Sequence, residues 1–86
     1  MRIWYVTNFD KNEEYLYQKA IKEFGQKELF ISKDATWKDG HKAEDCLALK
    51  CVGKISLVEF WKILNRIKDE FDYKTYCPCC GQKINN

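Results

Sequence analysis

The segment AEDCLALKCV, residues 43–52, is compatible with two secondary structures, and the two imply different folds. Its Ala, Glu, Leu and Lys residues favour a helix. Read as a strand, its alternating Leu47, Leu49 and Cys51 form one apolar face. An Asp-Gly pair at residues 39–40, which is typical of a two-residue hairpin turn, precedes it. Because the alternation and the turn agree, we predict that the segment is the returning strand of a hairpin.

The residues before this segment predict a strand, a helix and a second strand. RIWYVT (2–7) and KELFIS (27–32) are rich in β-branched or aromatic residues, as strands are. Between them, Asp10 is placed to cap a helix over about 11–24, and Glu13 completes a pair that resembles a capping box. The apolar positions at helical spacing are Leu16, Tyr17, Ala20, Ile21 and Phe24.

A second helix is predicted after Gly53 and extends through residue 71. Ser56 and Glu59 have the spacing of a capping box. Its apolar stripe consists of Leu57, Phe60, Trp61, Leu64, Ile67 and Phe71. The whole pattern predicts an α+β fold: a small antiparallel sheet with two helices in residues 1–71, followed by a C-terminal tail at 72–86 within the same single domain.

Length and composition indicate one small globular domain. The chain has 86 residues, of which 45% are hydrophobic, so a small core is expected. No run approaches the roughly 18 apolar residues of a membrane span, and the N-terminus lacks the features of a signal peptide. Five cysteines is an odd number, and clustered cysteines in a reducing compartment indicate metal or redox chemistry more often than a disulfide framework. We expect a cytoplasmic protein with no membrane partner.

The charge pattern does not favour a nonspecific nucleic-acid binder. The 15 Lys and Arg residues against 13 Asp and Glu residues give a net charge of +2, spread evenly along the chain. Such binders gain most of their affinity from basic side chains set along the phosphates. This balance lowers the expectation of a nucleic-acid partner.

The stretch YCPCCGQKI (76–84) contains a C-P-x-C-G motif formed by Cys77, Pro78, Cys80 and Gly81. It resembles the knuckle of zinc ribbons and of rubredoxin-like sites. Two thiolates from one tight turn reach a tetrahedral Zn²⁺ at about 2.3 Å, and the glycine tolerates the positive φ that the turn requires. The resemblance implies a structural zinc bound by Cys77 and Cys80.

The wider stretch FDYKTYCPCCGQKI (71–84) resembles the C-terminal tail of small phage and Gram-positive bacterial proteins that end in C-P-x-C-G-x-K-I/L. The resemblance covers the tail alone. It supports zinc as the cofactor and does not extend to residues 1–70.

A tetrahedral zinc site needs two further ligands, and the upstream candidates are His41, Cys46 and Cys51. Cys46 and Cys51 are five residues apart, which places them on opposite faces of a strand or about 140° apart on a helix. Three arrangements remain open. The segment bends and completes a four-cysteine site; one upstream cysteine and His41 join the knuckle; or two chains share a zinc through paired knuckles.

The simpler alternative is that Cys46 and Cys51 are small buried hydrophobic residues. Cys79, which lies inside the knuckle, is expected to be a bystander. The four cysteines that we predict as zinc ligands are Cys46, Cys51, Cys77 and Cys80.

Catalytic interpretations of the cysteines are disfavoured. A thioredoxin-like C-x-x-C opens a helix, but only six residues follow Cys80. A zinc deaminase requires H-x-E, yet Ala43 stands two positions after His41. We therefore expect no enzyme. The predicted function is a small zinc-binding interaction module that is encoded by a phage or mobile element and binds a host protein, with inhibition as one outcome. The alternative is a nucleic-acid-binding regulator with a structural zinc.

Overall fold

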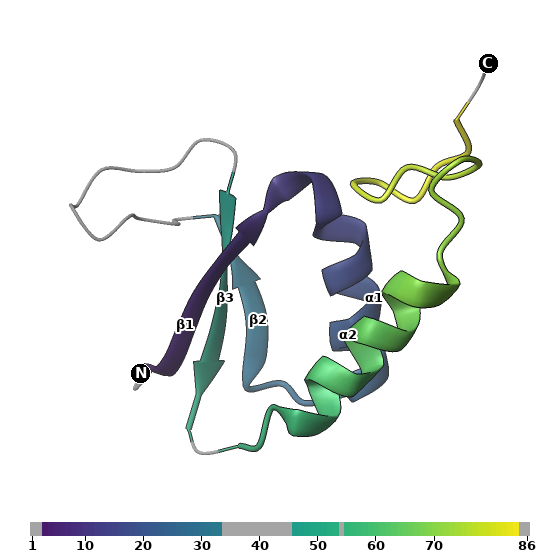
Figure 1. Cartoon of the computed structure of the whole chain (residues 1–86). Helices are drawn as coiled ribbons and strands as arrows, with labels where there is room; N and C mark the ends of the chain where they lie inside the picture. The colour runs from purple at the N-terminus through teal and green to yellow at the C-terminus, as the bar shows by residue number, and fades with distance from the viewer. Residues whose placement is uncertain (1–2, 34–45, 54, 85–86) are drawn as a thin grey trace.

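The computed structural model describes residues 3–33, 46–53 and 55–84. In these residues, two helices pack on one face of a three-stranded antiparallel sheet (Figure 1), which confirms the predicted α+β class. The predicted turn at residues 39–40 lies outside the described part of the chain. The elements are β1 (Ile3–Asp10), a 3₁₀ turn η1 (Lys11–Glu13), α1 (Glu14–Phe24), β2 (Leu29–Ser32), β3 (Cys46–Val52) and α2 (Val58–Glu70).

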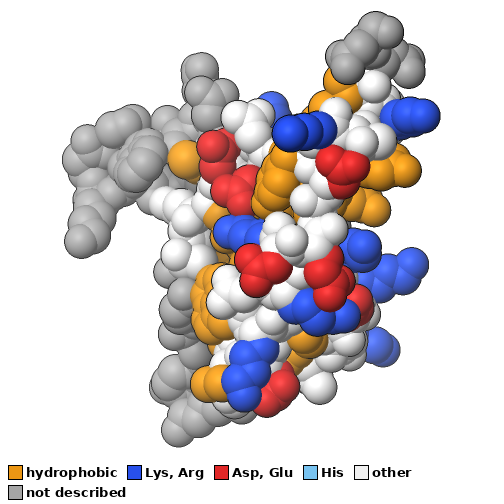
Figure 2. Space-filling model, turned by 45° about the vertical axis from the view of Figure 1, so that its right-hand side comes forward, with side chains coloured by type: hydrophobic (Ala, Val, Ile, Leu, Met, Phe, Trp, Pro, Cys, Tyr) orange, Lys and Arg blue, Asp and Glu red, His pale blue; other side chains and the backbone are white. Residues whose placement is uncertain are grey.

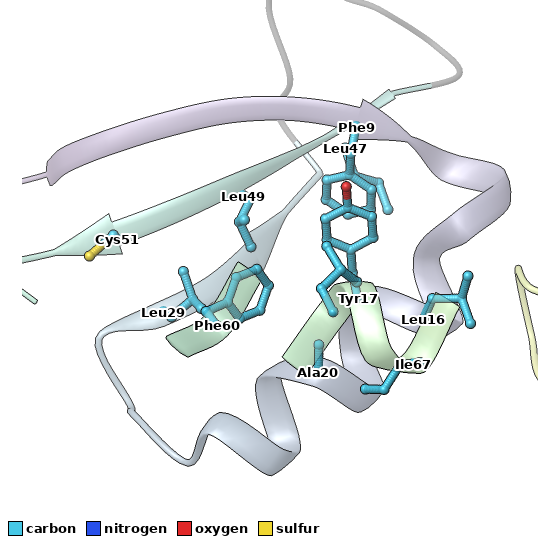
Figure 3. Packing of buried hydrophobic residues seen from close by; sticks show 11 residues of the cluster. Phe9, Leu16, Tyr17, Ala20, Leu29, Leu47, Leu49, Cys51, Phe60 and Ile67 are labelled. Carbon is cyan, nitrogen blue, oxygen red and sulfur yellow. The ribbon is translucent and has the colours of Figure 1, made fainter. Parts of the chain in front are cut away.

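The segment with two candidate structures is a strand, β3, and it lies in the middle of the sheet. The strand order is β1-β3-β2, and β3 is antiparallel to both neighbours. Leu49, for example, is opposite Thr7 on β1 and Ile31 on β2. Leu47, Leu49 and Cys51 are all buried, and they point into the space between the sheet and the helices (Figure 3). The alternation therefore identified the strand correctly.

Strand β1 is longer than the prediction of residues 2–7. It continues to Asp10, because β3 provides partners for Asn8, Phe9 and Asp10, the last of which lies opposite Cys46. Phe9, near the end of this extension, stacks on Tyr17 of α1 with ring centroids 3.9 Å apart. The extension thus anchors the start of the first helix to the sheet.

The helix predicted over about 11–24 is divided into η1 and α1. Asp10 acts as the predicted N-cap, and its side chain accepts a hydrogen bond from the Asn12 N–H at 2.9 Å. Glu13 forms an ion pair with Lys68 of α2, with 3.2 Å between the charged atoms. Helix α1 ends at Gly25, whose φ of 72° is in the left-handed region that glycine tolerates.

Helix α2 confirms the second predicted helix, but its first turn is not a capping box. Ser56 Oγ accepts from the N–H of Val58 at 3.4 Å, and the cap position is Leu57, which has no side-chain cap bond. Glu59 pairs instead with Lys62 at 3.7 Å. The helix is therefore held mainly by its apolar stripe.

The core lies between the sheet and the two helices (Figure 3). Phe60 is fully buried, and its ring meets those of Phe24 and Trp61 edge to face at centroid distances of 5.8 and 5.1 Å. Ion pairs at the surface join the helices, since Arg66 of α2 contacts Glu23 of α1. Residues from β1, β2, β3 and both helices meet in this one cluster, which consists of Phe9, Leu16, Tyr17, Ala20, Leu29, Leu47, Leu49, Cys51, Phe60, Leu64 and Ile67.

We predict that Phe60→Ala lowers the free energy of unfolding by about 3–5 kcal/mol, because it leaves a cavity in the centre of the core. Urea denaturation of both proteins measures the change. Val58→Ala, two residues away on the same helix and 58% exposed, is the matched control and should change the free energy of unfolding by less than about 0.5 kcal/mol. Equal losses for the two variants would contradict this core.

Candidate metal centre

The tail leaves α2 and reverses direction at Asp72. The Asp72 carboxylate accepts hydrogen bonds from the N–H groups of Lys74 at 3.1 Å and Thr75 at 3.2 Å. Its carbonyl oxygen accepts from the N–H of Tyr76 at 2.9 Å. The hydrogen bond from the Thr75 side chain, followed by those backbone bonds, lowers the pKa of Asp72. An ionised carboxylate therefore holds this turn at neutral pH.

The cysteines lie in the short hairpin that follows. Tyr76 and Lys83 form an antiparallel bridge, and the Cys77 N–H donates to the Gln82 carbonyl at 2.9 Å. The Gly81 N–H closes the turn by donating to the Cys77 carbonyl at 2.7 Å. Gly81 has a φ of 75°, as the motif requires of its glycine.

Backbone donors inside the turn are directed at the sulfur of Cys77. Hydrogen bonds from the backbone N–H groups of Cys80 and Cys79, and then from the Cys80 thiol, lower the pKa of Cys77. Desolvation, followed by the neighbouring sulfurs of Cys77 and Cys80, raises the pKa of Cys79. The pKa values of these two neighbouring thiols are thus shifted in opposite directions. Thiolates are the form that binds metal, so this difference fits a ligand role for Cys77 and a bystander role for Cys79.

The knuckle is docked on the N-terminal end of α1. The Tyr15 N–H, in the first turn of that helix, donates to the Pro78 carbonyl at 2.9 Å. First-turn amides have no partner within the helix, so the tail satisfies one of them. Gly81 faces the ring of Tyr15 so closely that a Cβ atom there would overlap ring carbons. The tail is thereby held in place through Tyr15.

The structure does not bring the upstream cysteines to the knuckle. Cys51 is buried in the core, where its thiol lies 3.8 Å from the Gly53 carbonyl oxygen. Cys46 is half-buried, opposite Asp10, and the two cysteines alternate to opposite faces of β3. Figure 1 shows the tail beyond the end of α2, away from β3. His41 lies outside the described residues.

Within residues 3–33, 46–53 and 55–84, no group of three or more His, Cys, Asp or Glu residues is placed to hold a metal ion. The set of Cys46, Cys51, Cys77 and Cys80 is therefore not assembled here. Cys77 and Cys80 lie together as a pair, since the Cys80 thiol and N–H both donate to Cys77. The arrangement offers half of a tetrahedral thiolate site.

Two residues that shape this centre were not singled out from the sequence. Asp72 precedes Thr75 by three positions, and an Asp before a Thr in a polar stretch is a turn signal that would have located it. Tyr15 has no such signal, because its contacts with Pro78 and Gly81 join residues far apart in the chain.

A groove of about 340 Å³ lies beside the knuckle, between α1, α2 and the tail. Asp72, Tyr76 and Gly81 form its tail side, and Tyr15 of α1 also lines it. Both acidic and basic side chains line the helix side, including the paired Glu23 and Arg66. The groove therefore has no single charge preference.

In comparisons with known proteins, no family model, curated protein or solved structure matches this chain. The resemblance of the tail to other knuckles thus rests on its motif. Neither helix of the described residues has the length and apolar character needed to cross a membrane.

We predict that Gly81→Ala undocks the tail, whereas Gly53→Ala does not. Both glycines have a positive φ, 75° and 80°, so both variants carry a backbone strain of about 1–2 kcal/mol. Only at Gly81 would the new methyl group also meet a ring, because nothing lies within 4 Å at Gly53. Amide hydrogen exchange at Tyr15 should accelerate in Gly81→Ala alone. Equal exchange rates in the two variants would show that Tyr15 does not hold the tail.

Proposed function

We propose that this protein is a small zinc-binding interaction module whose tail recognises another protein. The observation that carries the proposal is the pair of backbone N–H groups directed at the Cys77 sulfur, in a turn that leaves Cys80 exposed. Such donors favour the thiolate, which is the form of cysteine that binds metal.

The donor set fits Zn²⁺ better than a hard cation. Cys77 and Cys80 are soft thiolate donors, which favour zinc or iron over magnesium or calcium. When bound, zinc would cross-link the tail without entering a redox cycle. The chain's own contribution is to hold the two sulfurs in one turn and to fix that turn on α1 through Tyr15.

The partner surface that we propose surrounds the knuckle. The tail carries three large hydrophobic side chains at the surface: Tyr73, Tyr76 and Ile84 are 48%, 43% and 41% exposed. Figure 2 shows hydrophobic side chains gathered at this end of the molecule, while acidic and basic side chains intermingle over the helices. Exposed tyrosines are enriched in the centres of protein interfaces. A mixed charge pattern is unlike the basic stripe that nucleic acid requires.

The resemblance of residues 71–84 to phage and Gram-positive tails supports a bacterial host protein as the partner. A reducing cytoplasm would keep the five thiols free for metal. Inhibition of that host protein is the outcome that we propose for binding.

We predict that Cys77→Ser and Cys80→Ser each abolish zinc binding, while Cys79→Ser retains it. Elemental analysis of the purified chains measures the zinc content. Cys51→Ser is the matched control away from the tail: it should retain zinc and lose about 1–3 kcal/mol of stability, because it replaces a weakly polar thiol in the core with a more polar hydroxyl. Wild-type protein that takes up no zinc, or a Cys77→Ser variant that keeps it, would contradict the metal site.

The partner is tested by affinity capture from a bacterial lysate, with and without nuclease. We predict that the wild-type chain still captures a partner protein after nuclease treatment and at moderate salt, because apolar interfaces depend only weakly on salt. A Tyr73→Ala/Tyr76→Ala variant should lose that protein. Retention that disappears with nuclease, or that falls steeply as salt rises, would support the nucleic-acid alternative instead.

A further inference from the structure

Zinc held by the knuckle has two ligands from the tail and needs two more. A structural zinc site is almost always four-coordinate. Among the described residues, no third His, Cys, Asp or Glu side chain, Cys79 included, joins Cys77 and Cys80 in a group that could hold a metal ion. Cys51 lies in the core. The remaining donors must therefore approach the knuckle from outside the described surface of this chain.

The knuckle is accessible to such donors. It lies at one end of the molecule, beyond the last turn of α2 (Figure 1). Cys80 is exposed, and the attachment to Tyr15 is on the α1 side of the turn, through Pro78 and Gly81. The contacts that fix the tail to the body thus leave Cys80 open to solvent.

From these observations, and resting on the zinc site proposed above, we infer that two copies of this chain share one zinc ion, each supplying Cys77 and Cys80. A two-fold axis through the ion makes the two half sites equivalent, which is the symmetry of most homodimers. A second copy brings the two missing thiolates in the same turn, with the same backbone donors directed at Cys77.

The surroundings of the knuckle suit this occupant. A zinc ion with four thiolates carries a net negative charge, because the thiolates outnumber the charges of the ion. Each copy carries Lys83, which is exposed and bridged through its backbone to Tyr76, in the same hairpin as the cysteines, so a dimer would bring two lysines to the end of the molecule that holds the shared centre. Ile84, which is exposed in the same hairpin, would meet its equivalent in the second copy and bury apolar surface, while Tyr73 and Tyr76 stay open to the host protein.

The experiment titrates zinc into the chelator-treated full-length chain and follows mass and metal content by native mass spectrometry and light scattering. We expect a metal-free monomer that becomes a dimer, with saturation at one zinc for two chains. Cys46→Ser, Cys51→Ser and His41→Ala should give the same dimer. Cys80→Ser should remain a monomer without zinc, with an unchanged circular dichroism spectrum. Ile84→Asp, which keeps every cysteine, should weaken the dimer at least tenfold in its dissociation constant.

Other outcomes separate the two proposals. One zinc for each chain in a monomer would overturn the shared site and leave the zinc-binding module intact. Loss of the half-stoichiometric zinc in Cys51→Ser or His41→Ala would also overturn it, since an upstream residue would then be a ligand. A chain that binds no zinc would overturn both proposals.

Discussion

The pairing of β3 on both of its edges is the constraint on which the rest of this structure depends. Because β1 and β2 both pair with it over Ala48–Cys51, the middle of β3 is held on both edges and presents one continuous apolar face. Leu47 and Leu49 on that face meet α1 and α2 in the core. The sheet therefore sets where both helices lie, and through α1 it sets where the tail docks.

The pairing of β3 on both edges also determines where Cys46 and Cys51 lie. Cys51 continues the apolar alternation of Leu47 and Leu49, so its thiol is enclosed with them. Cys46 follows the opposite phase of the strand. A bend that brought both to one ion would break the ladder with β1 across several residue pairs. The spacing of five residues already indicated that Cys46 and Cys51 lie on opposite faces of a strand. The central position of β3 explains why the strand does not bend to bring the two cysteines together.

Elements that depend on local signals were predictable from the sequence. The alternation in β3, the apolar stripe of α2, and Asp10 with Gly25 at the ends of the first helical segment are all encoded within a few residues. Features that depend on distant partners were not. β1 extends to Asp10 because of β3, and Glu13 makes no side-chain cap bond but pairs with Lys68 of α2. The turn that holds Cys77 and Cys80 is also local, and its motif predicted it. Further metal ligands would come from residues distant in the chain or from another molecule, which local signals do not encode, and zinc itself stays a prediction.

The docking of the tail on Tyr15 has a consequence for how the molecule opens. The bond between Tyr15 and Pro78 closes a long loop, which costs more chain entropy than a contact between neighbours. Many side chains of the tail are exposed, so we expect that it can unfold locally while the sheet and helices stay folded. A metal that binds only the closed turn would shift this local equilibrium by mass action. The fraction of molecules with an open tail would then depend on the zinc concentration.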